Sequence, residues 1–500
     1  MIDTLHEAFA LVTGSGSILA LAIGVTIGVI GGAIPGMSAT MAVALTLPFT
    51  FSLEPIVGIL LLLGVYKGGI FGGSIPAILI KTPGTPASSA TVMDGYPLAE
   101  KGQAGKALGM ALYASCTADI ISNLALILCA GWLASFAMNF GPPEFFTLVV
   151  FSLMIIAGIS SNQLLKGVFA ASLGLLFATI GLDLIYGTDR FIMGNTSLMG
   201  GLNFIVVLIG LFALPEIISF ALNPSDKHGS VRKLGGDHVT FAEYKRCFKS
   251  ICRGGLIGAV LGSIPGIGAA PSAFLSYSEA RRNSPNKDNF GKGELEGVAA
   301  AEAGNNGVCG STLIPLLALG IPGDVVTAII IGAFMIHGIQ PGPLMFENNA
   351  GLIYALFMGL ILSSVFLLFI GGAAIKVFKY IVDVPRTILF PSVLVLCVYG
   401  AYAINNSLFD VLVMFVMGFI GYLMARLEIP AAPFLIAFIL GPLLEDNFRQ
   451  SMLVSGGDFS IMFRGPITWF FWFLTAMTLF FLIKGHMNSK KESKMALDLE

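Results

Sequence analysis

The chain has 500 residues, of which 56% are hydrophobic and only 11% are charged, and its mean hydropathy is +0.87. A water-soluble domain carries about 25% charged residues, so this composition excludes a soluble protein and predicts a surface that largely faces the lipid bilayer. The net charge of −2 gives no indication of a nucleic-acid partner, and we expect none.

Long intervals without Asp, Glu, Lys or Arg occur along the chain. Examples run from 8 to 53, from 191 to 215 and from 348 to 375. A helix needs about 20 residues to cross the hydrocarbon core, and its backbone groups must be hydrogen-bonded internally. The intervals do not alternate in polarity as the strands of a membrane barrel do. We therefore predict an all-α integral membrane protein with about twelve transmembrane helices.

A basic stretch divides the chain near its middle. Seven Lys or Arg residues lie between 223 and 253, and further Lys residues follow 485. The positive-inside rule places both segments in the cytoplasm and the N-terminus outside. We expect a first membrane repeat at 1–222, a connecting loop at 223–253, a second repeat at 254–485 and a cytoplasmic tail at 486–500.

The two halves share sequence motifs. GVTIGVIGGAIPG at 24–36 matches GGLIGAVLGSIPG at 254–266 with an offset of 230 residues. Farther along, Pro83-Gly84 matches Pro322-Gly323 with an offset of 239 residues. Two ordered motif pairs predict a duplicated unit. An odd number of crossings in the first half would make the two units inverted repeats.

Each glycine stripe runs into Ile-Pro-Gly. Glycine at every fourth position allows another helix to pack closely, which is the structural interpretation of the stripe. Proline and glycine together predict a helix break, and non-helical backbone at membrane depth must line a cavity. Ser38 and Thr40 follow the first break and Gly266 and Gly268 follow the second. New helices beginning there would direct N–H groups and positive dipole ends at an anion.

Two further segments are predicted to be tips of re-entrant hairpins. They are 81–91, with two prolines and several hydroxyl side chains, and 318–324. An ordinary loop outside the membrane is the alternative for each. The expected substrate site comprises Ser38, Ala39, Thr40, Thr82, Pro83, Gly84, Thr85, Ser88, Ser89, Gly266, Gly268, Pro322 and Gly323.

A polar cluster, EAGNN, precedes the second hairpin. The expected cation site comprises Gly36, Glu302, Asn305 and Asn306. Sodium prefers oxygen ligands, which amides and unwound backbone supply, so we favour Na⁺ as the coupling ion. H⁺ carried by Glu302 or Asp119 is the alternative. Glu302 at the membrane interface and Asp119 as a satisfied polar group between helices are the structural interpretations.

Enzyme motifs are missing from the sequence. There is no Walker A lysine motif and no GxSxG elbow, and His337 alone among the five histidines lies in an apolar segment. We expect no catalytic residues, no resident metal and no cofactor besides the coupling ion.

The motifs GGAIPGMSATMAVALTLPFTF, GGSIPAILIKTPGTPASSATVMDGYPLAEKGQAGKALG and EGVAAAEAGNNGVCGSTLIPLLALGIPGDVV carry a resemblance. The chain resembles the large membrane subunit of the tripartite tricarboxylate transporter family over essentially its whole length. One departure is Gly304, where the family pattern has alanine.

That resemblance implies a secondary transporter of the bacterial inner membrane that imports a tricarboxylate-like organic anion, driven by a sodium or proton gradient. It implies two partners, a small membrane subunit and a periplasmic solute-binding protein. The competing interpretations are a membrane channel, a membrane-embedded enzyme, or a scaffold subunit without its own coupled site.

Overall fold

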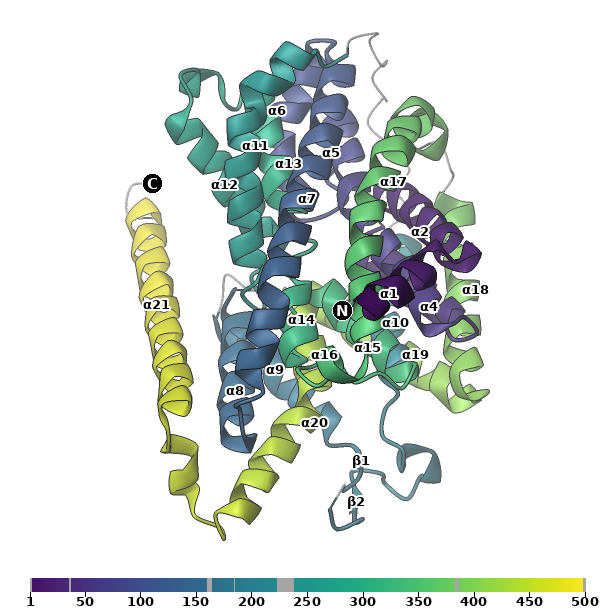
Figure 1. Cartoon of the computed structure of the whole chain (residues 1–500), viewed down its shortest axis with the longest axis vertical. Coiled ribbons are helices and arrows are strands. Elements are labelled where there is room, and N and C mark those ends of the chain that lie inside the picture. The colour runs from purple at the N-terminus through teal and green to yellow at the C-terminus, as the bar shows by residue number, and fades with distance from the viewer. Residues whose placement is uncertain are drawn as a thin grey trace.

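The computed structural model describes residues 2–35, 37–159, 164–183, 185–222, 238–382 and 386–497. Most of the described residues are helical (Figure 1). Strands β1 (Gly181–Leu182) and β2 (Asp189–Arg190) form one short antiparallel pair, with Gly181 opposite Arg190. The predicted all-α class is confirmed.

The first half contains α1 (Ile2–Thr13), α2 (Ser15–Ala33), α3 (Ala39–Thr46), α4 (Pro55–Gly72), α5 (Ser74–Ile80), α6 (Ser88–Glu100), α7 (Ala104–Ala137), α8 (Pro142–Ile159), α9 (Leu164–Ala178) and α10 (Phe204–Leu222). The second half contains α11 (Phe241–Gly262), α12 (Ala269–Asn283), α13 (Leu295–Asn306), α14 (Leu313–Leu319), α15 (Val325–Ile336), α16 (Met345–Asn348), α17 (Ala350–Val382), α18 (Arg386–Asn405), α19 (Leu408–Arg426), α20 (Ala431–Val454) and α21 (Pro466–Leu497). Short 3₁₀ turns occur at Leu47–Thr50, Thr196–Leu198, Lys287–Asn289 (η3) and Phe459–Phe463.

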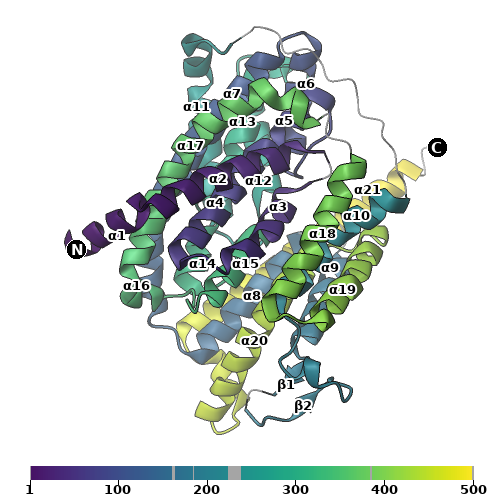
Figure 2. The same ribbon diagram turned by 90° about the vertical axis from the view of Figure 1, so that its right-hand side faces the viewer.

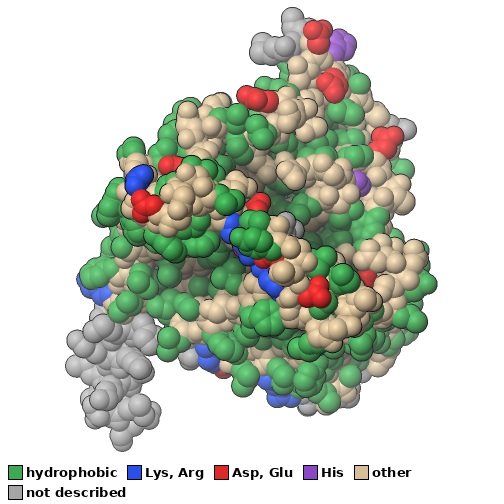
Figure 3. Space-filling model, turned by 90° about the horizontal axis from the view of Figure 1, so that it is seen from below, with side chains coloured by type: hydrophobic (Ala, Val, Ile, Leu, Met, Phe, Trp, Pro, Cys, Tyr) green, Lys and Arg blue, Asp and Glu red, His purple; other side chains and the backbone are tan. Residues whose placement is uncertain are grey.

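Within the described ranges, nine helices are long and apolar enough to cross a membrane, and four shorter apolar helices accompany them. The chain is therefore a multi-pass membrane protein, while the number of about twelve crossings stays a prediction. Hydrophobic side chains cover much of the face seen in Figure 3, and charged side chains on it are few. Helix α21 packs against α8 at the edge of the molecule (Figure 1).

The glycine stripe of α2 lies directly against α4. A Cβ added at Gly24, Gly28 or Gly32 would come within 2.2–2.3 Å of a carbonyl oxygen of α4. Side chains are therefore impossible at these positions, and the two backbones touch. The second half repeats this packing, since a Cβ would lie 2.2–2.8 Å from α13 or the turn after it at Gly254, Gly258 and Gly262.

The order of elements recurs in the two halves. Each half contains a glycine-striped helix, a break, two further helices, a short helix that ends in a tip, and a helix after the tip. These elements are α2–α6 in the first half and α11–α15 in the second. The long helix that follows each set packs on the other half: α7 of the first half packs on α11 and α13, and α17 of the second half packs on α2 and α4 (Figures 1 and 2). This correspondence supports the predicted duplication, and the inversion of the halves stays a prediction.

Part of the predicted connecting loop is helical. Residues 223–237 lie outside the described part, but α11 already begins at Phe241. Thr240 and Glu243 form a capping box there, in which each side chain accepts a hydrogen bond from the other residue's backbone N–H. Lys106 donates to Glu243 at 2.7 Å, and these hydrogen bonds lower the pKa of Glu243 to about 2. The basic residues from Lys245 to Arg253 therefore lie in α11 and not in a loop.

Candidate functional site

A cavity of about 220 Å³ lies where four interruptions of helices meet. Ser38–Thr40 after the first break and Gly266–Ala270 after the second break line it. Thr85–Ala87 and Asp324–Val326 line it from the ends of two hairpins. Segments from the two halves of the sequence thus line one cavity, as the paired motifs predicted.

The remaining wall is apolar. It is formed by Ile70 of α4, Ile156 of α8, and Ala432 and Ile436 of α20. None of the lining residues is Lys or Arg. An anion in this cavity would therefore depend on backbone N–H groups, hydroxyl groups and helix dipoles.

Both breaks expose the start of a new helix to the cavity. At the first break, the Ser38 Oγ accepts a hydrogen bond from Met41 N at 3.1 Å and so caps α3. At the second, Gly266 and Gly268 have φ of +86° and +68°, the left-handed region that favours glycine. Gly268 offers no side chain to cap α12, so the N–H groups of its first turn stay available to a ligand.

The two tips have the same construction. We define the first tip as 81–87 and the second as 320–324. The preceding short helices end in the left-handed conformation at Lys81 (φ +58°) and Gly320 (φ +71°). Each tip then places a Pro-Gly pair and a capping residue ahead of the next helix, at the constant offset of 239 residues.

Capping at the two tips is reciprocal. Thr85 N donates to Ser88 Oγ at 3.1 Å, and Ser88 N donates to Thr85 Oγ1 at 3.3 Å. Asp324 N donates to Thr327 Oγ1 at 2.8 Å, and Thr327 N donates to Asp324 Oδ1 at 2.7 Å. These bonds start α6 and α15 at the cavity. Four helix N-termini, those of α3, α6, α12 and α15, consequently converge on it, each carrying about half a positive charge.

Only some of the predicted substrate residues line the cavity. Those that do are Ser38, Ala39, Thr40, Thr85, Gly266 and Gly268. Those that do not are Thr82, Pro83, Gly84, Ser88, Ser89, Pro322 and Gly323.

The second group includes residues that hold the tips in place. Gly84 N donates to Gly73 O at 3.0 Å, and a Cβ at Gly84 would lie 2.5 Å from Gly32 O. Gly323 O accepts from Gly266 N at 2.7 Å, which joins the second tip to the second break. The Pro-Gly tips are therefore seated against the glycine-striped helices and their breaks, and they support the lining residues.

Asp324 is a cavity residue that sequence reasoning missed. It occupies the second tip where Thr85 occupies the first, so the two halves present different charges to the same space. Its Oδ2 accepts a hydrogen bond from the Tyr66 hydroxyl of α4 at 2.8 Å. Its position at the offset of Thr85, directly after Pro-Gly, is the signal that could have identified it.

The Glu302 carboxylate lies behind the first tip and is fully buried. Its Oε1 accepts hydrogen bonds from Ser74 Oγ at 2.6 Å and from Thr91 Oγ1, and its Oε2 accepts from Ser115 Oγ at 3.1 Å. Asn306 Nδ2 donates to Ser115 Oγ at 2.7 Å and to Glu302 Oε2 at 3.4 Å. Helix α13 is thereby tied to α7 and to both legs of the first hairpin, α5 and α6.

This environment places Glu302 inside the protein rather than at the surface, although it does not line the cavity. Asn305, its neighbour on α13, is also fully buried. Neither the Nδ2 nor the Oδ1 of Asn305 forms a well-aligned hydrogen bond with a described residue, although its amide is close enough to the Glu302 carboxylate to stabilise it. A buried amide without a well-aligned hydrogen bond costs about 1–3 kcal/mol, so Asn305 has capacity left to bind a ligand. Gly36, the fourth residue of the expected cation site, lies outside the described residues.

Asp119 belongs to a separate buried ion pair. Lys67 Nζ donates to Asp119 Oδ2 at 2.8 Å, to Leu360 O at 2.8 Å and to Asn123 Oδ1 at 3.2 Å. Ser364 of α17 also donates to Asp119. All three donors of the ammonium group are used, and both charged side chains are 1% exposed. The group fits the paired structural role considered for Asp119, because it links α4, α7 and α17.

No group of three or more His, Cys, Asp or Glu side chains suited to hold a metal ion occurs in the described part of the chain. The cluster around Glu302 has a different composition, since it contains one carboxylate together with hydroxyl and amide side chains.

The chain is similar to one protein family and to two related bacterial proteins. Residues 18–436 match the tripartite tricarboxylate transporter TctA family. An uncharacterized 52.8 kDa protein of the TAR-I ttuC′ 3′ region of Agrobacterium vitis is 36% identical over 445 residues, 89% of each chain. An uncharacterized protein of the TAR-II ttuC′ 3′ region of the same organism is 37% identical over 210 residues, 42% of this chain and 87% of that protein. No solved structure is significantly similar. The chain belongs to the tripartite tricarboxylate transporter TctA family.

Proposed function

We propose that the chain is the subunit that carries a carboxylated organic anion, tricarboxylate-like in chemistry, across the bacterial inner membrane. A cation gradient drives import, and a periplasmic solute-binding protein delivers the substrate. The observation that supports this most strongly is the convergence of four helix N-termini, from both halves, on one cavity. Membership of a transporter family agrees with it, and a tripartite family implies partner subunits.

The substrate carboxylates would bind at the breaks and tips. The first-turn N–H groups of α3 and α12 and the hydroxyls of Ser38, Thr40 and Thr85 are the donors available there. A hydrogen bond to a charged group contributes about 1.5–3 kcal/mol, so a few such donors give useful affinity without a permanent cation. A cavity without Lys or Arg also allows the anion to leave again.

We place the coupling cation at Glu302, Asn305 and Asn306, with Gly36 as a further expected ligand. The observations that support this are the buried carboxylate, the surrounding hydroxyls of Ser74 and Thr91, and the buried amide of Asn305, which forms no well-aligned hydrogen bond. These are oxygen ligands, which Na⁺ prefers. We favour Na⁺ over a proton on Glu302, because a metal ion would use the Glu302 carboxylate and the amide oxygens of Asn305 and Asn306 together, whereas a proton on Glu302 would need one acceptor at most.

Coupling follows from the position of Glu302. Its carboxylate holds both legs of the first hairpin, α5 through Ser74 and α6 through Thr91, and α6 starts at the tip that presents Thr85 to the cavity. A cation that orders this cluster would fix Thr85 in its binding position. Thermodynamic linkage then requires that substrate also raises the affinity for the cation.

Transport assays in proteoliposomes test this function. The chain is reconstituted with the small membrane subunit, the binding protein is added loaded with each of a panel of mono-, di- and tricarboxylates, and a sodium or a pH gradient is imposed. We expect sodium-driven accumulation of a di- or tricarboxylate above its external concentration. Equilibration without accumulation would indicate a channel, and no flux with any substrate would indicate a scaffold subunit. Either result would contradict the proposal.

A further inference from the structure

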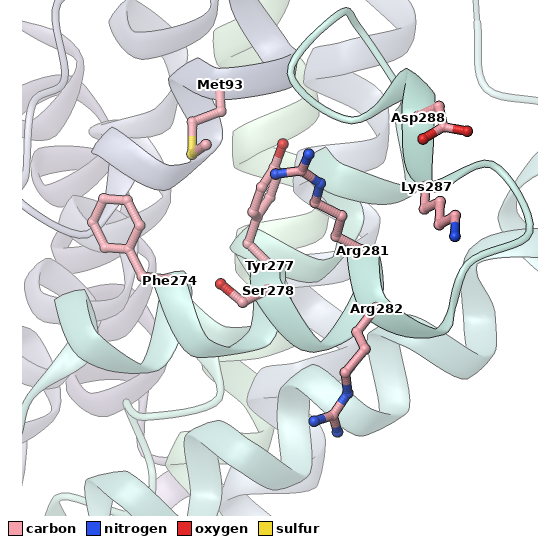
Figure 4. A pocket seen from close by; sticks show the side chains of 8 residues that line it. All are labelled: Met93, Phe274, Tyr277, Ser278, Arg281, Arg282, Lys287 and Asp288. Carbon is pink, nitrogen blue, oxygen red and sulfur yellow. The ribbon is translucent and has the colours of Figure 1, made fainter.

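A second pocket lies at the far end of α12 from the cavity. It has a volume of about 630 Å³ and is bordered by α6, α12 and the segment around η3 (Figure 4). Arg281 and Lys287 supply positive charge to it, Ser278 supplies a hydroxyl, and Phe274 and Met93 supply apolar surface. Nothing in the function proposed above uses these residues.

The pocket and the cavity share their walls. Helix α12 begins with Ala269 and Ala270 in the cavity, and Phe274, Ser278 and Arg281 follow at helical spacing on the same face. Helix α6 starts just after the cavity residue Ala87 and bears Met93 of the pocket. Helices α6 and α12 also pack against each other. The two spaces therefore lie in series along this pair of helices.

The pocket lining carries more positive than negative charge, because Arg281, Arg282 and Lys287 are accompanied by a single carboxylate, that of Asp288. Neither Arg281 nor Lys287 forms an ion pair with any residue that the structure describes, and the Ser278 hydroxyl makes no hydrogen bond there. Arg282, by contrast, pairs with Glu279 at 2.5 Å and extends to the opposite side of α12 from Arg281 (Figure 4). Favourable interaction with the helix dipole could explain Arg281 alone, but Lys287 lies beyond the helix, in η3.

The wall that carries Lys287 is fixed in place. Asp94 of α6 is fully buried, and its Oδ1 accepts backbone hydrogen bonds from Gly291, Gly293 and Glu294 at 2.8–2.9 Å. Its Oδ2 accepts from the Tyr277 hydroxyl at 2.8 Å. One carboxylate thus clamps the segment after η3 to α6 and α12, which gives the pocket a defined shape.

We propose that this pocket is a second anion site, in which the carboxylates of the transported substrate bind as it passes between the cavity and the water at the end of the molecule where α11 begins. The inference rests on the proposed function. Arg281 and Lys287 bind carboxylate groups, the Ser278 hydroxyl donates a further hydrogen bond, and the local positive potential raises the concentration of anion near the cavity. A di- or tricarboxylate gains more binding free energy than a monocarboxylate, because two of its carboxylate groups can contact Arg281 and Lys287 at the same time.

The test is the double variant Arg281→Gln/Lys287→Gln in the complete reconstituted transporter. Half-saturating concentrations for exchange are measured separately with substrate applied from each face, at low and at high ionic strength. For substrate applied at the face where α11 begins, we expect the half-saturating concentration to rise about three- to tenfold at low ionic strength and to lose its salt dependence. The half-saturating concentration at the other face should be unchanged. Lys245→Gln/Lys249→Gln on α11 is the matched control, with the same loss of charge outside the pocket.

The charge-conserving variant Arg281→Lys/Lys287→Arg should have wild-type half-saturating concentrations. That result would show that the defect of the Gln variant comes from lost charge and not from misfolding. Normal values from both faces in the double variant overturn the inference while leaving the proposed function standing. Absence of carboxylate transport by the wild-type protein overturns both. An anionic lipid headgroup has the same chemistry as the ligand, so the assay is repeated with zwitterionic lipid only. A defect that requires phosphatidylglycerol in the membrane assigns the pocket to lipid and overturns the inference.

Discussion

The first and second tips have one backbone design and two chemistries. Both contain a left-handed residue at the end of a helix and a Pro-Gly pair, and in both the next helix is capped reciprocally. The first presents the neutral Thr85 and is supported by Glu302, whereas the second presents Asp324 and is supported by Tyr66. The predicted duplication would account for the shared geometry. For the difference we propose distinct tasks, substrate binding with cation coupling at the first tip and charge discrimination at the second.

The largest effect is expected from the support of the first tip. Glu302→Gln keeps the shape of the side chain and can still accept hydrogen bonds from Ser74 and Thr91, but it removes the charge that would hold a cation. We expect folded protein in which sodium no longer stimulates uptake. Uptake against sodium concentration, together with the folded yield on size-exclusion chromatography, measures this. Full sodium stimulation in the variant would remove Glu302 from the cation site.

A steric change at the first tip should affect stability next. A Cβ in Gly84→Ala would lie 2.5 Å from Gly32 O and 2.7 Å from Gly73 Cα, both of them backbone atoms that cannot yield easily. We expect a loss of about 1–3 kcal/mol, seen as a lower temperature of unfolding in detergent. Gly131→Ala is the control, because its Cβ would meet only Phe346 at 3.9 Å. Equal unfolding temperatures for the two variants would show that the tip is not seated as described.

Hydroxyl groups at the cavity should matter for affinity. Thr85→Ala and Ser38→Ala each remove one donor, and we expect a ten- to hundredfold weaker affinity for a carboxylate at roughly 1.5–3 kcal/mol per charge-assisted bond. Ser89→Ala is the comparison, since Ser89 lies outside the cavity lining. If the hydroxyls serve only as caps, folded yield would fall instead and the affinity of the remaining folded protein would be normal.

The smallest effect should come from making the tips more alike. Asp324→Asn keeps one oxygen that can accept from Thr327 N, and its new amide N–H can donate to the Tyr66 hydroxyl oxygen, while the negative charge is removed. At a separation of about 4 Å in water-filled surroundings, where the dielectric constant is about 80, loss of a carboxylate near a bound anion is worth about 1 kcal/mol, so affinity should rise about fivefold. Thr85→Asp should act in the opposite direction. Isothermal titration of both variants measures this, and an unchanged affinity in each would refute discrimination by charge.

Sequence alone could predict the parts of the site that local chemistry determines. Proline and glycine specify where helices stop, and Ser38 and Thr85 follow such stops directly, so their place at the cavity was predictable. Ser88 was expected to bind substrate, but its hydroxyl is turned toward Thr85 by the cap. The walls supplied by Ile156 and Ala432 come from α8 and α20 and carry no motif, because only long-range packing brings them to the cavity.

The central claim is that substrate and Na⁺ bind to sites coupled through the first hairpin. The most direct measurement is the dissociation constant of the substrate as a function of sodium concentration at constant pH, for the wild-type transporter and for Asn305→Ala. We predict that wild-type affinity rises with sodium and that this dependence weakens in the variant, because a proposed oxygen ligand of the cation is removed. Sodium-independent affinity, with uptake that follows a pH gradient in sodium-free buffer and is abolished by Glu302→Gln, would contradict the claim.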